Sequence, residues 1–374
     1  MSILAISFLI SLISTLLLVR YSHLHTRFSG DSDLSGVQKF HVLIVPRVGG
    51  ISILLGVFSA LPLLYAKNTD VGSFGLLLIG SSLPVFTAGL CEDLTKKVGV
   101  RIRLLAAFVA AGFAGYFLNA WLSSVQILGI DNLMLTYPIF AILITCFAVA
   151  GVSNAFNIID GYNGLSAMVA VIILLGIAYV AFQVNDYPIM VSAFAMVGAL
   201  LGFLLLNYPR GLIFLGDGGA YFIGFWIAEL SVLLTSRHAE VSKWFPLLLC
   251  FYPIFETIFS IYRRVVLKGV HPGMPDATHL HQLIFKRLVR WSVSSDSAKN
   301  TIQRNSLTSP YLWVLSLIAV IPAVLFWRYH ILLKLFCVFF ALVYLWLYWS
   351  IVRFKVPLFL MLENNTFDTP NRSG

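Results

Sequence analysis

Polar residues recur at short intervals in the segment NAFNIIDGYNGL, residues 154–165, within an otherwise apolar region. Asn154, Asn157 and Asp160 are spaced by three, so in a helix they share one face, because each step of three advances about 300°. Amide and carboxylate oxygens on one face suit a hard cation such as Mg²⁺, which takes few protein ligands. The following Asn163 stands between glycines that let a flat group approach. The pattern predicts a ligand site, with polar packing between helices as the alternative.

Adjacent carboxylates follow an apolar run in CEDLTKKVGVRIRL. Glu92 and Asp93 precede several cations, of which Lys96 is the first. A carboxylate pair beside cations is suited to orient or deprotonate one anionic partner while another is bound. Taken alone, the same residues also fit a solvated charged turn.

Two glycine-containing stretches are further candidates for ligand contacts. Arg47 stands in PRVGG, where it is placed to bind a phosphate or to extend along the membrane interface. Asp217 stands in FLGDGG, where a flexible backbone can present a carboxylate to a metal, and Phe214 begins the same stretch. Such turns are common, and no βαβ context makes this one a dinucleotide fingerprint.

Histidines stand in the segment PDATHLHQ of a long polar stretch, residues 262–310. His279 and His281 are suited to bind phosphate or to act as acid or base. Zinc is not favoured, because no third nitrogen or sulfur ligand follows at the usual spacing.

The composition places these stretches in a membrane protein. The chain has 374 residues, of which 59% are hydrophobic and 11% charged, and its mean hydropathy is +0.90. The four cysteines lack CxxC spacing and fit small buried hydrophobes, with no disulfide framework. The apolar runs predict an all-α polytopic fold of about eleven spans near 2–20, 48–66, 74–91, 104–122, 138–156, 165–184, 188–206, 219–236, 244–261, 311–328 and 331–350.

Basic residues predict how the chain crosses the bilayer. Most Lys and Arg residues fall on one set of loops, which places the amino terminus outside and the carboxyl terminus in the cytoplasm. The net charge of +9 then reflects topology and anionic lipid headgroups, and no nucleic acid partner is expected. The expected organisation is one transmembrane catalytic domain at 1–350, a cytoplasmic tail at 351–374, and cytoplasmic loops at 21–47, 92–103, 154–165, 207–219 and 262–310.

Together these stretches resemble the polyprenyl-phosphate N-acetylhexosamine-1-phosphate transferase superfamily, the WecA/MraY-like membrane enzymes of glycosyltransferase family 4. The resemblance runs from Pro46 to about Pro310 and rests on PRVGG, EDLTKK, NAFNIIDGYNGL, FLGDGG and PDATHLHQ in that order. RNSLTSPYLW at 304–313 is similar to the WecA-type branch, and nothing resembles the triple-histidine signature of MraY proper.

The resemblance implies an activity. A sugar-1-phosphate would pass from a UDP-amino sugar to undecaprenyl phosphate, with release of UMP, to initiate synthesis of a cell-surface polysaccharide such as the O-antigen of lipopolysaccharide. The expected cofactor is Mg²⁺, with Mn²⁺ as a substitute. The expected location is a bacterial inner membrane, with the active site facing the cytoplasm and a homodimer suggested by resemblance only.

The resemblance also assigns roles to residues. The catalytic residues would be Glu92, Asp93, Asp160 and Lys96. The substrate-binding residues would be Arg47, Asn154, Asn163, Phe214, His279 and His281, and the metal ligands Asp217 and Asn157. Phe214 would stack on uracil, Asn163 would hydrogen-bond it, and Asp93 rather than Glu92 would act on the lipid phosphate. Relatives usually carry Asp in place of Glu92, often carry Asp in place of Asn163, and often carry His in place of Gln282.

Two alternatives belong beside this interpretation. A transporter or flippase would also place polar groups at broken membrane helices, and Glu229 and Glu256 are its candidate charges. A closer MraY-like phospho-MurNAc-pentapeptide transferase is the second alternative. The one-sided placement of the polar stretches favours the enzyme over the transporter.

Overall fold

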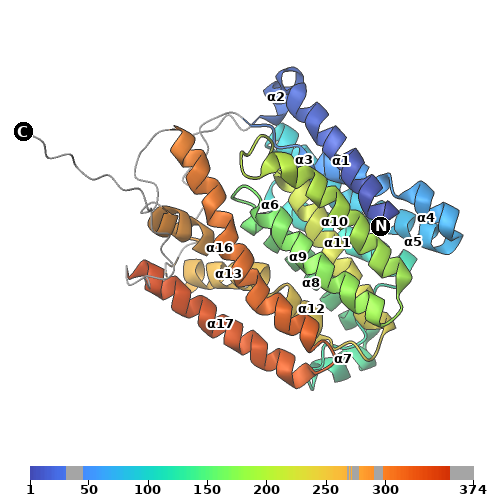
Figure 1. Ribbon diagram of the computed structural model, residues 1–374. Coiled ribbons are helices and arrows are strands. Elements are labelled where there is room, and N and C mark those ends of the chain that lie inside the picture. The colour runs from blue at the N-terminus through green and yellow to red at the C-terminus, as the bar shows by residue number, and fades with distance from the viewer. Residues whose placement is uncertain (31–44, 268, 270, 272–277, 290–297, 354–374) are drawn as a thin grey trace, which may run out of the picture.

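Helices make up the fold of this chain, as Figure 1 shows. The computed structural model describes residues 1–30, 45–267, 269, 271, 278–289 and 298–353. Parts of the expected loops 21–47 and 262–310, and the tail from residue 354, lie outside the described residues. In the described part, an isolated bridge between Gly30 and Pro46 is the sole β pairing.

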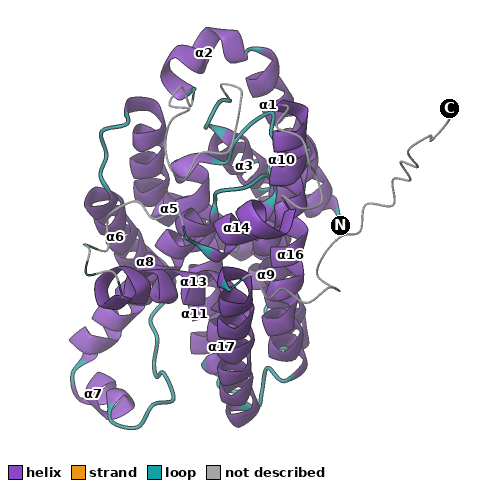
Figure 2. Cartoon of the chain, turned by 90° about the vertical axis from the view of Figure 1, so that its left-hand side faces the viewer, coloured by secondary structure: helices purple, strands orange, loops and turns teal. Residues whose placement is uncertain are grey.

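Helix α7 lies at the end of the bundle away from α2 (Figures 1 and 2). The bounds of the elements are α1 (Ser2–Arg20), α2 (Ser22–Ser29), α3 (Gly49–Phe58), α4 (Leu61–Lys67), α5 (Thr69–Thr95), α6 (Val100–Leu118), α7 (Ile130–Thr136), α8 (Pro138–Ile159), α9 (Leu165–Gln183), α10 (Tyr187–Asn207), α11 (Gly216–Arg237), α12 (Trp244–Leu249), α13 (Phe251–Tyr262), the π-helical η1 (Arg263–Leu267), α14 (Leu280–Leu283), the π-helical η2 (Ile284–Val289), α16 (Ala298–Leu325) and α17 (His330–Val352).

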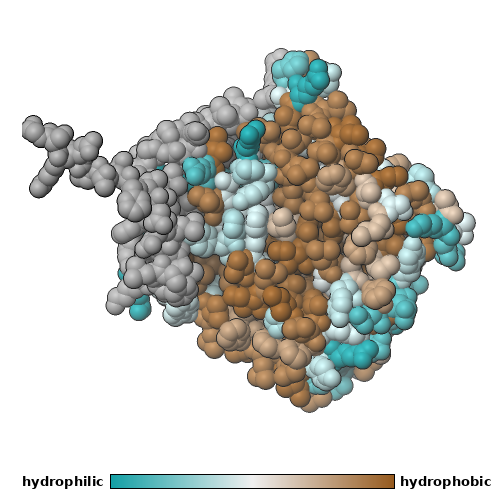
Figure 3. All heavy atoms as spheres, viewed as in Figure 1, coloured by the Kyte–Doolittle hydropathy of each residue, from teal (hydrophilic) through white to brown (hydrophobic). Residues whose placement is uncertain are grey.

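The expectation of an all-α membrane protein is confirmed. Within the described residues, ten helical stretches are long and apolar enough to cross a membrane. The surface seen in Figure 3 is largely apolar between a polar cap over α2 and polar patches at the opposite edge, as a bilayer requires. The side of the membrane on which each end lies stays a prediction from the charge pattern.

The expected eleventh span, 244–261, is wrong as a single helix. The chain forms α12 and α13 instead, and the two helices meet at Cys250. Pro253 has no backbone N–H, so it cannot donate to the Leu249 carbonyl one turn earlier, and the helix breaks there. A hydropathy count cannot detect this break, because both halves are apolar.

Helix α11 forms the centre of the bundle. The whole of its apolar window is buried inside the protein, and α11 packs along α5 and α8. Its first residues lie where α5 and α8 end and where α3 begins. One end of the bundle therefore collects the polar stretches that are far apart in the sequence.

Candidate active site

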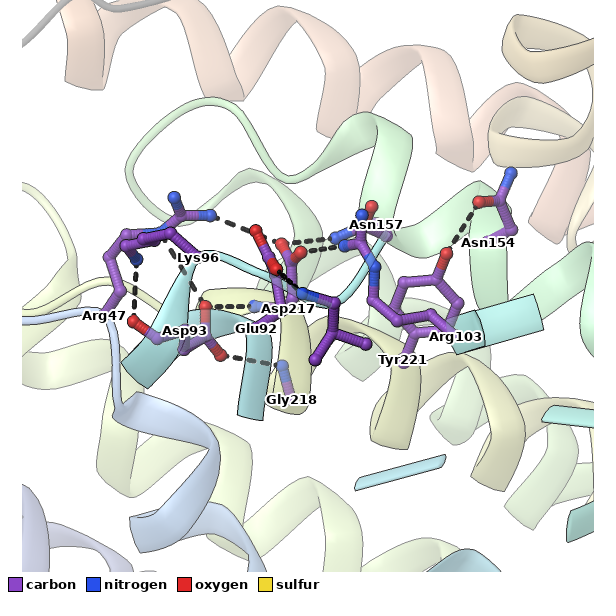
Figure 4. A network of polar contacts seen from close by, with 11 residues as sticks. Arg47, Glu92, Asp93, Lys96, Arg103, Asn154, Asn157, Asp217, Gly218 and Tyr221 are labelled. Carbon is purple, nitrogen blue, oxygen red and sulfur yellow. Dashed lines mark hydrogen bonds and ion pairs between the residues drawn. The ribbon is translucent and has the colours of Figure 1, made fainter. Parts of the chain in front are cut away.

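The carboxylate of Asp217, at the start of α11, is the centre of a polar cluster (Figure 4). Its Oδ1 accepts hydrogen bonds from Asn157 Nδ2 at 2.9 Å and from Arg47 at 3.3 Å. Its Oδ2 pairs with the guanidinium of Arg103. Asp217 is only 8% exposed, so its charge depends on these partners.

Backbone pairing between PRVGG and FLGDGG brings Arg47 to this cluster. The N–H groups of Gly49 and Gly50 donate to the carbonyls of Phe214 and Leu215, each at 3.0 Å. A Cβ on Gly50 would lie 2.5 Å from a backbone nitrogen of α11, so this close approach requires glycine. The glycines of the motif therefore position the arginine that precedes them.

Asp93 holds the start of α11 in place. Its two carboxylate oxygens accept the backbone N–H groups of Asp217 and Gly218, each at 2.9 Å. Asp93 is 1% exposed, and Arg47 Nε lies 3.8 Å from its Oδ1. A carboxylate at a helix N-terminus satisfies unpaired donors and interacts favourably with the helix dipole. Because both oxygens are used in this way, the geometry favours a positioning role for Asp93 over the expected action on a lipid phosphate.

Glu92 and Lys96 close the turn that follows α5. Glu92 Oε2 accepts the backbone N–H of Val98 at 2.7 Å. Lys96 adopts a left-handed backbone conformation with φ of 57°, and its Nζ donates to the backbone carbonyl of Asp93 at 2.7 Å. Lys96 is exposed, so its ammonium lies at the edge of the cluster.

The shared face expected for the asparagines of α8 is present. Asn157 contacts Asp217, and Asn154 Oδ1 accepts the hydroxyl of Tyr221 at 2.8 Å. The ring of Tyr221 also lies beside the guanidinium of Arg103, 5.5 Å from its centroid. Residues three apart on α8 therefore meet residues four apart on α11.

Asp160 departs from the expected helical face, because α8 ends at Ile159 and Asp160 has a non-helical backbone. Burial raises the pKa of Asp160 from 3.8 to about 7, Arg47 opposes this rise, and Asp93 adds to it. The pKa of Asp160 therefore depends on the charges of Arg47 and Asp93 in the same cluster.

Asn163 contacts protein groups on several sides. Its Nδ2 donates to the carbonyl of Pro209 at 3.1 Å, and its backbone N–H donates to Asn305 Oδ1 at 2.8 Å. The hydroxyl of Ser309 donates to its carbonyl at 2.6 Å, which ties RNSLTSPYLW to NAFNIIDGYNGL. Asn163 is 5% exposed and Phe214 is partly exposed. Their contacts with uracil stay predictions.

The two histidines lie together beside the loop that follows α8. Their rings stack with centroids 5.2 Å apart and an angle of 4°, and His281 meets Tyr162 edge-on at 5.5 Å. Burial, as the largest cause, and nearby His279 together lower the pKa of His281 to about 3, so His281 is neutral. Asp276, which precedes both, lies outside the described residues.

Residues 74–235 match the model of glycosyl transferase family 4, and this region contains both Asp93 and Asp217. Over this region the chain is similar to members of this family. A probable undecaprenyl-phosphate N-acetylglucosaminyl 1-phosphate transferase of Bacillus subtilis is 28% identical over 74% of this chain and 75% of its own. An undecaprenyl-phosphate alpha-N-acetylglucosaminyl 1-phosphate transferase of Yersinia pestis is 29% identical over 69% of this chain and 70% of its own. The protein of the same name from Thermotoga maritima is 28% identical over 79% of this chain and 87% of its own.

Sequence reasoning missed three contacts of the site. Arg103 is one cation among several in its loop, and Tyr221 is one aromatic residue in an apolar span, so spacing marked neither. Glu256 was a candidate for a transport pathway, yet its Oε1 lies 2.9 Å from Nδ1 of His279. Glu256 thus belongs with the histidine motif, and this removes one of the two charges that the transporter alternative used.

Few described side chains of the cluster are suited to hold a metal ion. Across the described residues, no group of three or more His, Cys, Asp and Glu side chains could hold an ion. Asp217 and the amide oxygen of Asn157 instead fit Mg²⁺, which is commonly held by one or two side chains, water and substrate phosphates. Arg47 and Arg103 now contact the same carboxylate, and a diphosphate would offer them an alternative partner.

Proposed function

We propose that this protein transfers an N-acetylhexosamine-1-phosphate, or a related amino-sugar phosphate, from a UDP-sugar to undecaprenyl phosphate with release of UMP. The observation that carries the proposal is the buried Asp217 carboxylate at a helix N-terminus, flanked by Asn157 and by the guanidinium groups of Arg47 and Arg103. The match to the family model and the names of the relatives support the same class of reaction.

The arrangement suits a reaction between two anions. An oxygen of the lipid phosphate attacks the β-phosphorus of the UDP-sugar, and the bond to the uridine-side phosphate breaks. Arg47 and Arg103 would offset the repulsion between the partners, and the N-terminus of α11 adds backbone N–H donors and a favourable dipole. Mg²⁺ held by Asp217 and Asn157 would withdraw charge from the diphosphate when bound.

A cavity in the spanning region supports a lipid acceptor. Its volume is about 540 Å³, and it lies between α8, α11, α12 and the start of α13. Its lining is mostly apolar and includes residues between Leu122 and Ile130 and, on the second half of α11, between Ala228 and Thr235. The cavity lies along the half of α11 away from Asp217, so its apolar surface suits a hydrocarbon chain within the bilayer and not the phosphate.

The proposed setting is a bacterial inner membrane with the polar end of the bundle facing the cytoplasm. The distribution of Lys and Arg supports this orientation. A cytoplasmic site would meet a soluble nucleotide sugar while the prenyl chain stays in the bilayer. A homodimer is an expectation from resemblance alone.

The experiment uses purified full-length protein with undecaprenyl phosphate, Mg²⁺ and a panel of UDP-amino sugars. Release of UMP and formation of labelled lipid are followed together, with and without EDTA. Lipid product that disappears with EDTA is expected, and the donor that yields it identifies the sugar. Absence of lipid product from every donor, with folded protein, would overturn the proposal in favour of transport.

A further inference from the structure

Glu256 is a fully buried carboxylate on α13. Its Oε1 accepts Nδ1–H of His279 at 2.9 Å and the backbone N–H of Leu280 at 3.3 Å. Its Oε2 accepts the hydroxyl of Tyr344 at 2.7 Å. Three donors converge on this side chain, so it is an acceptor and fits the ionised form.

These contacts determine the tautomer of His279. A carboxylate accepts only, so Nδ1 must carry a proton. Nε2 lies 3.1 Å from NH2 of Arg264, and a guanidinium donates only, so Nε2 carries the lone pair. The ring therefore presents a basic nitrogen on the side opposite to Glu256.

The backbone also fixes His279. Its N–H donates to Gln282 Oε1 at 3.1 Å, and the two residues form a capping box at the start of α14. Its ring stacks on His281, whose Nε2 lies 3.5 Å from the position that a Cβ on Gly161 would occupy. The ring of His281 thus lies between His279 and the loop that carries Asp160.

The two histidines of the motif differ in their partners. His281 is neutral because burial lowers its pKa to about 3, and its Nδ1 has no hydrogen-bond partner among the described residues. His279 has a carboxylate on one nitrogen, which stabilises an imidazolium when Nε2 takes up a proton. Among the described residues, the charged and titratable groups around the pair are Tyr162 after α8, Glu256 on α13, Arg263 and Arg264 on η1, and Tyr344 and Tyr348 on α17.

We propose that Glu256 is a positioning residue that holds His279 with its proton on Nδ1, so that Nε2 takes up a proton when the guanidinium of Arg264 turns from it to a phosphate monoester. This inference rests on the proposed function. A lipid phosphate arriving as the monoanion gives its O–H proton to Nε2, and the Glu256 carboxylate stabilises the imidazolium. The dianion oxygen then bonds to the β-phosphorus as the bond to the uridine-side phosphate breaks.

The first test is Glu256→Gln, with Glu240→Gln as the matched exchange at an exposed position. The Glu256 variant is expected to lower kcat by about a hundredfold and to move the acidic limb of the pH–rate profile to lower pH. The limb moves because no carboxylate remains to stabilise the imidazolium. An unchanged profile with a lowered rate would indicate a structural role and overturn the proposal.

A double-mutant comparison tests whether Glu256 acts through His279. If it does, adding Glu256→Gln to His279→Gln causes no further loss of rate, because both changes remove the same interaction between the carboxylate and the imidazole. Losses that multiply would overturn the proposal.

The tautomer is measurable without any activity. Nitrogen-15 NMR of wild-type protein labelled at histidine is expected to show a residue protonated at Nδ1, assigned by its loss in His279→Gln. A proton on Nε2 instead would overturn the inference even if Glu256→Gln does not fold. If no donor supports transfer, the proposed function fails while this measurement still reports on Glu256 and His279.

Discussion

Alanine at position 89 would push α5 away from α11 at the point where Asp93 caps α11. A Cβ on Gly89 would lie 2.6 Å from N and Cα of Gly218 and 2.7 Å from the carbonyl carbon of Asp217. Carbon atoms in good contact are about 3.5–4.0 Å apart, so relief requires a displacement of about 1 Å. All three contacts are backbone atoms, so no side-chain rotation provides that relief.

The displacement acts directly on the site. Asp93 lies one turn after Gly89 on α5, and its hydrogen bonds to α11 are 2.9 Å long. A shift of about 1 Å would break them, and misplacement of that size costs about a hundredfold in rate. Overpacking also destabilises the fold by about 1–3 kcal/mol, partly offset by about 0.5–1 kcal/mol from the helix propensity of alanine.

The assay compares Gly89→Ala with Gly80→Ala on the same helix. A Cβ on Gly80 meets nothing within 4 Å, so this control gains the same propensity without the contact. We measure kcat for lipid-linked product and the thermal midpoint of both variants. A rate loss of about a hundredfold is expected for Gly89→Ala alone. Equal rates in two folded variants would refute the reasoning.

Three further predictions concern the charges of the site. Asp217→Asn should lower kcat at least about a hundredfold in folded protein, because the partner of two guanidinium groups is lost, and near-normal turnover would contradict its assignment. Arg103→Gln should lower the rate by about a hundredfold. The exposed neighbour Arg101 is the control, and Arg101→Gln should leave the rate unchanged. Equal losses in both variants would argue against a specific contact between Arg103 and Asp217. Because the pKa of Asp160 is raised to about 7, the stability contributed by its bound proton is lost as the pH rises through that value. At a pH above 7 and without added Mg²⁺, Asp160→Asn should therefore have a higher thermal midpoint than the wild type. The difference should vanish near pH 3.8, the pKa of the carboxyl in the unfolded chain. A difference that is independent of pH would contradict the assignment.

The sequence by itself determined the class of protein and the list of polar stretches. Hydropathy over a window of about twenty residues is a local property, so ten of the eleven expected spans are present as helices. The face shared by Asn154 and Asn157 is also local, because it follows from helical periodicity. These features needed no knowledge of which helices are neighbours.

Only the tertiary structure decided what each polar group does. Asp93 and the residue it caps are 124 positions apart, and their meeting depends on glycines that let α5 and α11 touch backbone to backbone. The pairing of Arg103 with Asp217 likewise depends on which helices pack together, and so does the hydrogen bond between Glu256 and His279. Spacing along the chain gives the chemical types available at one end of the bundle, whereas partner, burial and tautomer are set by long-range packing that a local pattern does not encode.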